Sequence, residues 1–183
     1  MKRNYLLFTA AIFLFCSCSA KAQTVASPDL ANAFADAGLT LLKEKVSPRN
    51  FSLPVLTGGT QSLNDLQGKV VFLNFWATWC GPCREEMPSM EALYNRYKDR
   101  GLEIIAVNSG EKQTDVFNFM KNNKLTFPAW LDEDARISIS YGIQAIPTSF
   151  LIDRDGKIIL RLVGSIDWDT PKIHTAFETL LSM

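Results

Sequence analysis

The stretch that decides the fold is residues 75–83, which read FWATWCGPC. Its first residue ends residues 69–75 (KVVFLNF), an apolar run that fits a strand buried on both faces. It precedes residues 84–100, where apolar side chains recur at helical spacing. The two cysteines, Cys80 and Cys83, are therefore expected where a buried strand ends and a long helix begins.

The rest of the chain alternates between strand and helix patterns. Around Pro54, residues 51–56 predict a short edge strand, and Gly58-Gly59 predicts a turn into a second one. The later predicted strands are residues 102–107, 129–131, 148–152 and 157–163, the last two forming an antiparallel hairpin. The later predicted helices are residues 114–122, 136–141 and 170–181. This order predicts an α/β fold with a mixed central β-sheet and helices on both faces.

Length and composition bound the class of protein. A chain of 183 residues that is 47% hydrophobic and 21% charged is expected to form one globular domain. Its 19 basic and 19 acidic residues balance, so nothing in the charge favours a nucleic-acid partner. Four cysteines and one histidine are too few for a disulfide scaffold or a histidine-based metal site, and we predict no metal.

The first 22 residues are predicted to be a signal peptide, because two basic residues precede a short apolar run. Ala20-Lys21-Ala22 fits a cleavage site that releases a soluble chain. Alternatively, the residues before Cys18 resemble a lipobox, which would leave Cys18 lipidated and anchor the protein to a membrane. An uncleaved N-terminal anchor is a third possibility. We therefore expect an exported, periplasmic protein, either soluble or anchored through its N-terminus.

Residues 23–47 are predicted to be a helix and linker ahead of the main domain. Ser27-Pro28 is typical of a helix start, and apolar residues continue at helical spacing as far as Leu41. This helix could be a spacer or a flap on the domain, or it could contact a partner or a membrane.

The position of the cysteines predicts redox chemistry. A cysteine at a helix N-terminus faces unpaired backbone N–H groups and the positive end of the helix dipole, which favour its thiolate. Cys80 is therefore the predicted attacking thiol, and Cys83 is the resolving thiol one turn inward. Gly81 leaves the approach to Cys80 open, and Pro82 is tolerated in a first helical turn.

Three other interpretations of the CxxC pair are weaker. A zinc site needs further cysteines or histidines, and a c-type haem attachment needs histidine where this chain has Arg84. A purely structural disulfide would close a very short loop and so add little stability.

The motif resembles the active site of the thioredoxin superfamily, and three further segments resemble its TlpA/ResA-type branch. These are residues 65–71 (DLQGKVV), 106–111 (AVNSGE) and 146–153 (IPTSFLID). The resemblance covers about residues 48–181 and implies a thioredoxin-like domain over residues 48–183. It implies a thiol-disulfide oxidoreductase whose redox centre is the Cys80–Cys83 disulfide, with no other cofactor.

The family also implies roles for residues around the cysteines. Pro147 matches a cis-proline beside the disulfide, and the backbone of Ile146 and Thr148 would pair with a substrate chain. A trans turn proline is the alternative. Trp76 and Trp79, with Gly81 and Pro82, would form the surface that a substrate contacts, although a tryptophan on a buried strand is as often core.

Two positions concern proton transfer. Asn74 stands where cytoplasmic thioredoxins carry a buried acid that handles the proton of the inner cysteine. Glu111 matches a glutamate near the active site of ResA-type members and could exchange a proton with Cys83, or it could merely cap the helix that begins near Lys112. Many ResA-type members have glutamate where this chain has Gly81, which puts their narrow substrate preference in doubt here.

The function predicted first is reduction of disulfides in exported proteins, such as apocytochromes c before haem attachment. The resemblance implies that a membrane electron donor of the DsbD/CcdA kind supplies the electrons. A disulfide-introducing oxidase is an alternative, although Gly81-Pro82 disfavours it. The others are a binding module with an inert disulfide, and a peroxidase, whose proline-threonine-cysteine pocket is absent from the sequence.

Overall fold

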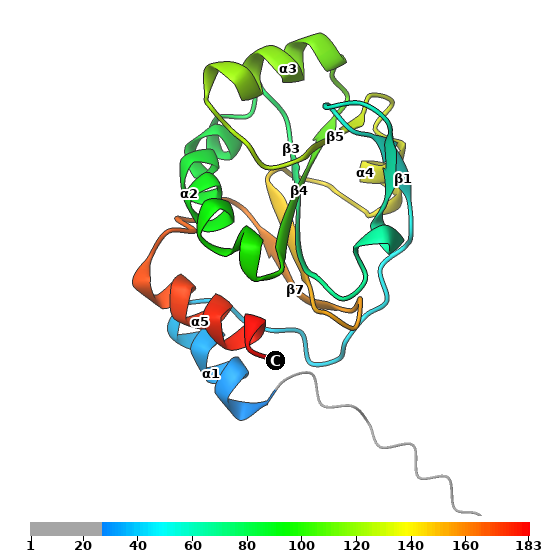
Figure 1. Ribbon diagram of the computed structural model, residues 1–183. Coiled ribbons are helices and arrows are strands. Elements are labelled where there is room, and N and C mark those ends of the chain that lie inside the picture. The colour runs from blue at the N-terminus through cyan, green and yellow to red at the C-terminus, as the bar shows by residue number, and fades with distance from the viewer. Residues whose placement is uncertain (1–26) are drawn as a thin grey trace, which may run out of the picture.

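The computed structural model describes residues 27–183, and it centres on a five-stranded mixed sheet (Figure 1). The strand order is β5-β4-β3-β6-β7. β3 is parallel to β4 and antiparallel to β6, β4 is parallel to β5, and β6 is antiparallel to β7. The strands are β3 (Val70–Trp76), β4 (Leu102–Ser109), β5 (Ala129–Asp132), β6 (Thr148–Ile152) and β7 (Ile158–Val163). Every residue of the central strand β3 is buried, as its largely apolar pattern predicts, and Asn74 is the one polar residue in it.

One face of the sheet is covered by four helices. They are α1 (Pro28–Asp36), α2 (Gly81–Tyr97), α3 (Gln113–Asn122) and α5 (Pro171–Leu181). The apolar sides of all four helices share one core cluster with Phe72 and Trp76 of β3. α2 begins at Gly81, three residues before the predicted start, because Cys80 is already its N-cap; its last turn continues as a short 3-10 helix, η2 (Lys98–Arg100).

The opposite face carries shorter elements. A two-stranded sheet, β1 (Ser52–Pro54) with β2 (Thr60–Ser62), lies there with η1 (Leu63–Leu66) and α4 (Arg136–Ser140). Their apolar residues pack on Val71, Leu73 and Phe75 of β3 in a second core cluster. Helices thus lie on both faces as predicted, but the coverage is very unequal.

The segment before the main domain is packed onto it and is not a free linker. α1 is confirmed, but it ends at Asp36 because Gly38 turns the chain with a positive φ of 78°. The chain then follows the edge strand β7, where the Leu42 N–H donates to the Ile159 carbonyl and Val46 exchanges backbone hydrogen bonds with Ile158. The predicted signal peptide, residues 1–22, lies outside the described residues. In the described part of the chain, no helix is long and apolar enough to cross a membrane.

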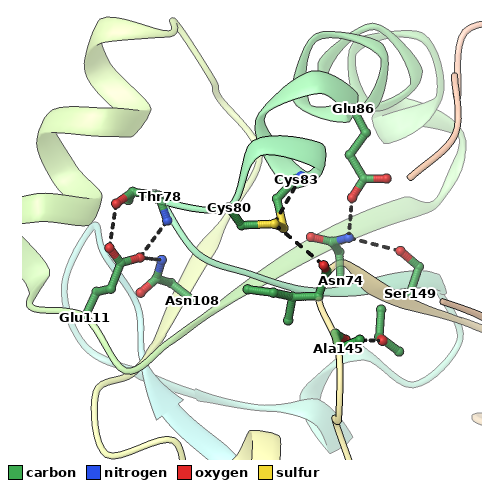
Figure 2. The surroundings of a disulfide bond; sticks show 11 residues. Asn74, Thr78, Cys80, Cys83, Glu86, Asn108, Glu111, Ala145 and Ser149 are labelled. Carbon is green, nitrogen blue, oxygen red and sulfur yellow. Dashed lines mark hydrogen bonds between the residues drawn. A yellow bond between two sulfur atoms is a disulfide. The ribbon is translucent and has the colours of Figure 1, made fainter. Parts of the chain in front are cut away.

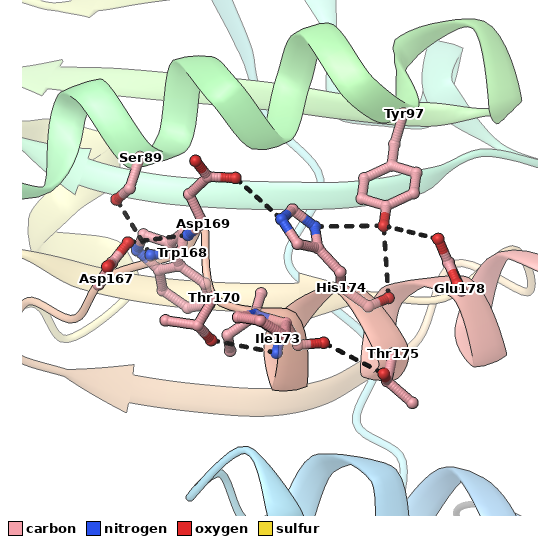
Figure 3. A network of polar contacts seen from close by, with 11 residues as sticks. Ser89, Tyr97, Asp167, Trp168, Asp169, Thr170, Ile173, His174, Thr175 and Glu178 are labelled. Atoms are coloured by element: carbon pink, nitrogen blue, oxygen red, sulfur yellow. Dashed lines mark hydrogen bonds and ion pairs between the residues drawn. The ribbon is translucent and has the colours of Figure 1, made fainter.

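α5 is joined to the C-terminal end of α2 by a polar network (Figure 3). The Tyr97 hydroxyl lies 3.2 Å from His174 Nδ1 and 3.2 Å from Glu178 Oε1. His174 Nε2 lies 2.8 Å from Asp169 Oδ1. The rings of Tyr97 and Phe177 stack, and Phe177 in turn packs on Phe34 of α1. The two helices and α1 therefore form one stack at this end of the domain.

Candidate active site

The two cysteines form a disulfide at the first turn of α2, with unequal surroundings. Cys80 is 5% exposed and caps the helix, its Sγ accepting the backbone N–H of Cys83 at 3.2 Å. Cys83 is fully buried one turn inward. Once the disulfide is reduced, that N–H and the helix dipole would stabilise a thiolate on Cys80 and not on Cys83.

The predicted cis-proline lies beside the disulfide. The Ile146–Pro147 peptide bond is cis, and the Ile146 carbonyl oxygen is 3.7 Å from Cys80 Sγ. Ile146 is partly exposed, so a chain that approaches Cys80 can contact this residue. The prediction for Thr148 is wrong, because this residue is fully buried and pairs with β3 on one side and β7 on the other.

The two tryptophans have opposite environments. Trp79 is 71% exposed next to Cys80, as expected of a residue that contacts a partner. Trp76 is fully buried and packs against Phe119, so its predicted contact with substrate is wrong and the alternative of a core tryptophan holds. Its place on a strand covered on both faces explains the difference. Gly81 and Pro82 are exposed in the first turn of α2.

Glu111 holds the loop that precedes the cysteines. One carboxylate oxygen accepts the Thr78 backbone N–H and an Asn108 amide N–H, each at 2.7 Å, and the other accepts the Thr78 hydroxyl. It makes no hydrogen bond to Cys83, so the predicted partnership with Cys83 is not formed. The capping alternative is wrong as well, because Lys112 is the N-cap of α3 and the first N–H of that helix, on Gln113, is accepted by Glu133 and not by Glu111.

A different carboxyl group, Glu86, lies buried one turn after Cys83 (Figure 2). It is 2% exposed and accepts an N–H from Asn74 at 2.9 Å and the indole N–H of Trp168 at 3.1 Å. Asn74 also donates to Ser149 Oγ at 3.0 Å. Burial raises the pKa of Glu86 to about 7, although the hydrogen bonds from Trp168 and Asn74 oppose the rise.

Glu86 was not among the predicted site residues, because it stands in the charged run Arg84-Glu85-Glu86, which is typical of a solvated helix face. One signal could have found it. Glu86 is three residues after Cys83 and one before Met87, so helical spacing places it on the buried side of α2.

Two open grooves are lined by residues that neighbour the cysteines in sequence. One, of about 560 Å³, lies between the active-site loop and α3 and is lined by Trp79, Arg84, Asp115 and Asn118 among others. The other, of about 500 Å³, lies where α2 faces the residues after β7 and is lined by Glu86 and Ser89, with Asp167 opposite. A substrate chain thus has room beside Cys80, and solvent has a route toward Glu86.

The arrangement suits thiol-disulfide exchange. A sulfur at a helix terminus next to the surface, a fully buried second sulfur and a carboxyl group that titrates near neutral pH are the parts that a two-step exchange requires. Among residues 27–183, no cluster of three or more histidine, cysteine, aspartate or glutamate side chains could hold a metal ion.

Comparison with known proteins agrees with this chemistry. The model of the AhpC/TSA family matches residues 45–161, which is more than half of the chain. The chain belongs to this family. Its fold is thioredoxin-like: the thiol:disulfide interchange protein of Chlorobium tepidum TLS superposes with a TM-score of 0.63 at 31% identity, over 75% of this chain and 97% of that one. StoA from Bacillus subtilis gives a TM-score of 0.60 at 32% identity, over 69% and 96%.

Relatives in the family share the reaction type. A thiol-disulfide oxidoreductase ResA of Bacillus cereus is 43% identical over 168 residues, covering 90% of this chain and 91% of that protein. ResA of Bacillus subtilis is 42% identical over 130 residues, covering 71% and 73%. With its Cys80–Cys83 pair, the chain is therefore a protein thiol-disulfide oxidoreductase.

Proposed function

We propose that this oxidoreductase works as a reductant of disulfides in exported proteins. The observation that carries the proposal is the asymmetry of the cysteine pair: Cys80 is held at the helix terminus beside an exposed tryptophan, whereas Cys83 is fully buried. The Cys80 thiolate attacks a substrate disulfide, and the substrate's first sulfur leaves. Cys83 then attacks Cys80 Sγ, which re-forms the Cys80–Cys83 disulfide and releases the second substrate sulfur.

Cys83 must lose a proton before it can attack. We propose that Glu86 takes this proton, because its carboxyl group lies one turn away on the same buried side of α2 and has a pKa of about 7. Glu111, by contrast, is held by Thr78 and Asn108 and positions the loop.

The direction of the reaction is tested by the redox equilibrium of the pair in glutathione or dithiothreitol buffers, read by alkylation and mass. A potential of about −250 mV or lower supports the reductant. A potential of about −120 mV would instead support the disulfide-introducing oxidase, and a pair that is never reduced would support an inert disulfide.

The proton role of Glu86 is tested by the pH dependence of turnover. We expect Glu86→Gln to slow the resolving step and to remove a titration near pH 7 from the rate profile. Glu85→Gln is the matched control, since Glu85 is exposed on the same turn of α2. A Glu86→Gln profile that matches the wild type would exclude this role.

The proposed location is the periplasm, after export directed by residues 1–22, with either a soluble chain or one lipidated at Cys18. Fractionation and lipid labelling of the wild type and a Cys18→Ala variant distinguish the soluble form from the lipidated form.

The proposed electron donor is a membrane dithiol of the DsbD/CcdA kind, and disulfide-bonded apocytochromes c are the proposed substrates. Faster reduction of an oxidised CxxCH peptide than of glutathione disulfide would support the substrate class.

A further inference from the structure

The side-chain oxygen of Asn74 is a buried acceptor without a donor. Asn74 is fully buried in the middle of β3, and its Oδ1 has no hydrogen-bond partner among the described residues. Native proteins rarely leave a buried polar atom unpaired, because it has lost its hydration and gained nothing in return. Such an atom beside a redox centre points to a partner that exists in another state of that centre.

The orientation of the Asn74 amide is fixed by its neighbours. Nδ2 lies 2.9 Å from Glu86 Oε1 and 3.0 Å from Ser149 Oγ. While Glu86 is ionised its carboxylate can only accept, so turning the amide over would place two acceptor oxygens against each other. Oδ1 is therefore held on the other side, and Figure 2 shows it turned toward the disulfide.

Breaking the disulfide creates a donor there. An external dithiol attacks Cys80 Sγ through one thiolate, and Cys83 Sγ leaves with the bonding electron pair and takes up a proton. The second thiol of the dithiol then displaces Cys80 as a thiolate, so the dithiol leaves as a disulfide and the pair has gained two electrons. Cys83 now carries an S–H group, which the disulfide lacks.

We propose that Asn74 Oδ1 accepts a hydrogen bond from the Cys83 thiol in the reduced protein, which makes Asn74 a positioning residue of the redox step. The inference rests on the proposed reduction cycle. Its consequence is a bias toward the reduced pair, because the acceptor is satisfied only when Cys83 bears its proton. The same amide, through Nδ2, holds the Glu86 carboxyl group that we propose to receive that proton.

The first test is the redox equilibrium of Asn74→Leu, which removes the acceptor while keeping the number and branching of the side-chain heavy atoms. We expect the equilibrium to shift about tenfold toward the disulfide, equivalent to a potential lower by about 30 mV. Ser149→Ala is the matched control, since it removes a partner of Nδ2 without touching Oδ1, and we expect it to leave the potential unchanged. An unchanged potential in Asn74→Leu overturns the inference.

A double mutant excludes an indirect effect through Glu86. Asn74→Leu in a Glu86→Gln background keeps the full shift if it acts through Oδ1. If the shift disappears there, Asn74 acts only through Glu86 and the inference fails.

A spectroscopic measurement does not depend on the folding of an Asn74 variant. The infrared difference between reduced wild type and reduced Cys83→Ser isolates the S–H stretch of Cys83. We expect a frequency below that of a free thiol, because hydrogen bonding weakens the S–H bond; a free-thiol frequency overturns the inference. If dithiothreitol cannot reduce the wild-type disulfide, the proposed function is overturned together with the role of Asn74. If the potential of the pair is about −250 mV or lower but the S–H band is that of a free thiol, only the role of Asn74 is overturned.

Discussion

The two ends of α2 are held by polar networks of opposite character. At the C-terminal end, Tyr97, His174 and Glu178 contact one another in a network that is partly open to solvent. At the N-terminal end, Asn74 and Glu86 are almost completely enclosed, one with an unpaired oxygen and the other with a pKa of about 7. The first network joins two helices, and the second places titratable and unsatisfied groups beside a reactive sulfur.

The difference shows that the network beside the cysteines is the one that costs this fold stability. Enclosing a carboxyl group and an unpaired acceptor lowers the free energy of unfolding, and such features persist where a function needs them. Trp168 connects the two ends, because its backbone N–H donates to Ser89 and its indole N–H donates to Glu86, directly before α5 begins.

The largest expected effect comes from replacing either cysteine at the N-terminal end of α2. Cys80→Ser should lose disulfide exchange completely, because no thiolate remains at the helix terminus. Cys83→Ser should form mixed disulfides with substrate that it cannot resolve. Non-reducing electrophoresis after mixing with a disulfide substrate measures both outcomes. Equal retained activity in the two variants would contradict the assigned roles.

The next largest effect concerns the stability of the buried network. Because the pKa of Glu86 is raised from 4.5 to about 7 in the folded state, wild-type stability should fall as the pH rises through this interval. The loss by pH 8 should be roughly 3 kcal/mol relative to pH 4. Glu86→Gln should not show this pH-dependent loss of stability. Glu85→Gln should still show it, because Glu85 is exposed.

Urea unfolding of all three proteins across this pH range makes the comparison. If wild type and Glu86→Gln lose stability in parallel with rising pH, the pKa of Glu86 is not raised by burial.

At the other end of α2, Tyr97→Phe should cost about 1 kcal/mol of stability by removing the hydroxyl contacts with His174 and Glu178. It should leave the redox potential unchanged, since Tyr97 belongs to the last turn of α2. Tyr94→Phe is the control, because the Tyr94 hydroxyl makes no hydrogen bond to any described residue. A shift of potential in Tyr97→Phe would show that the two networks are coupled along the helix.

The smallest expected effect is that of Gly81→Glu. A side chain at this position meets no atom within 4 Å and no strained backbone, so the fold should be unaffected. The added charge beside Cys80 should disfavour its thiolate and slow its alkylation at neutral pH a few-fold, less so at high salt. A rate equal to the wild type at low salt would place the new carboxylate away from the sulfur.

The sequence predicted the frame of the fold well where the patterns were strong. The apolar run ending at Phe75 and the helical spacing after Cys83 located the central strand and α2, and the motif located the redox pair. The sequence-based prediction failed where the burial of a residue depends on three-dimensional packing. Trp76 and Thr148 lie close to the cysteines in sequence or space, yet the sheet encloses both.

The errors at the two glutamates have different causes. Glu111 stands in a loop, where the sequence pattern does not give the direction of a side chain. The helical spacing that places Glu86 on the buried side of α2 was outweighed by its charged neighbours. Glu111 turns to Thr78 and Asn108 instead of Cys83, and Glu86 turns inward although its neighbours Arg84 and Glu85 are exposed.

The stack of α1 on α5 has a consequence for how this domain meets a surface. Tyr97 contacts α5 at one end of α2, and Cys80 caps the other, about 25 Å away along the 17 residues of the helix. α1, with which the described chain begins, packs on α5 and so lies near the Tyr97 end of α2 (Figure 1). A domain held from its N-terminal side would therefore direct its disulfide outward, toward whatever approaches from solution.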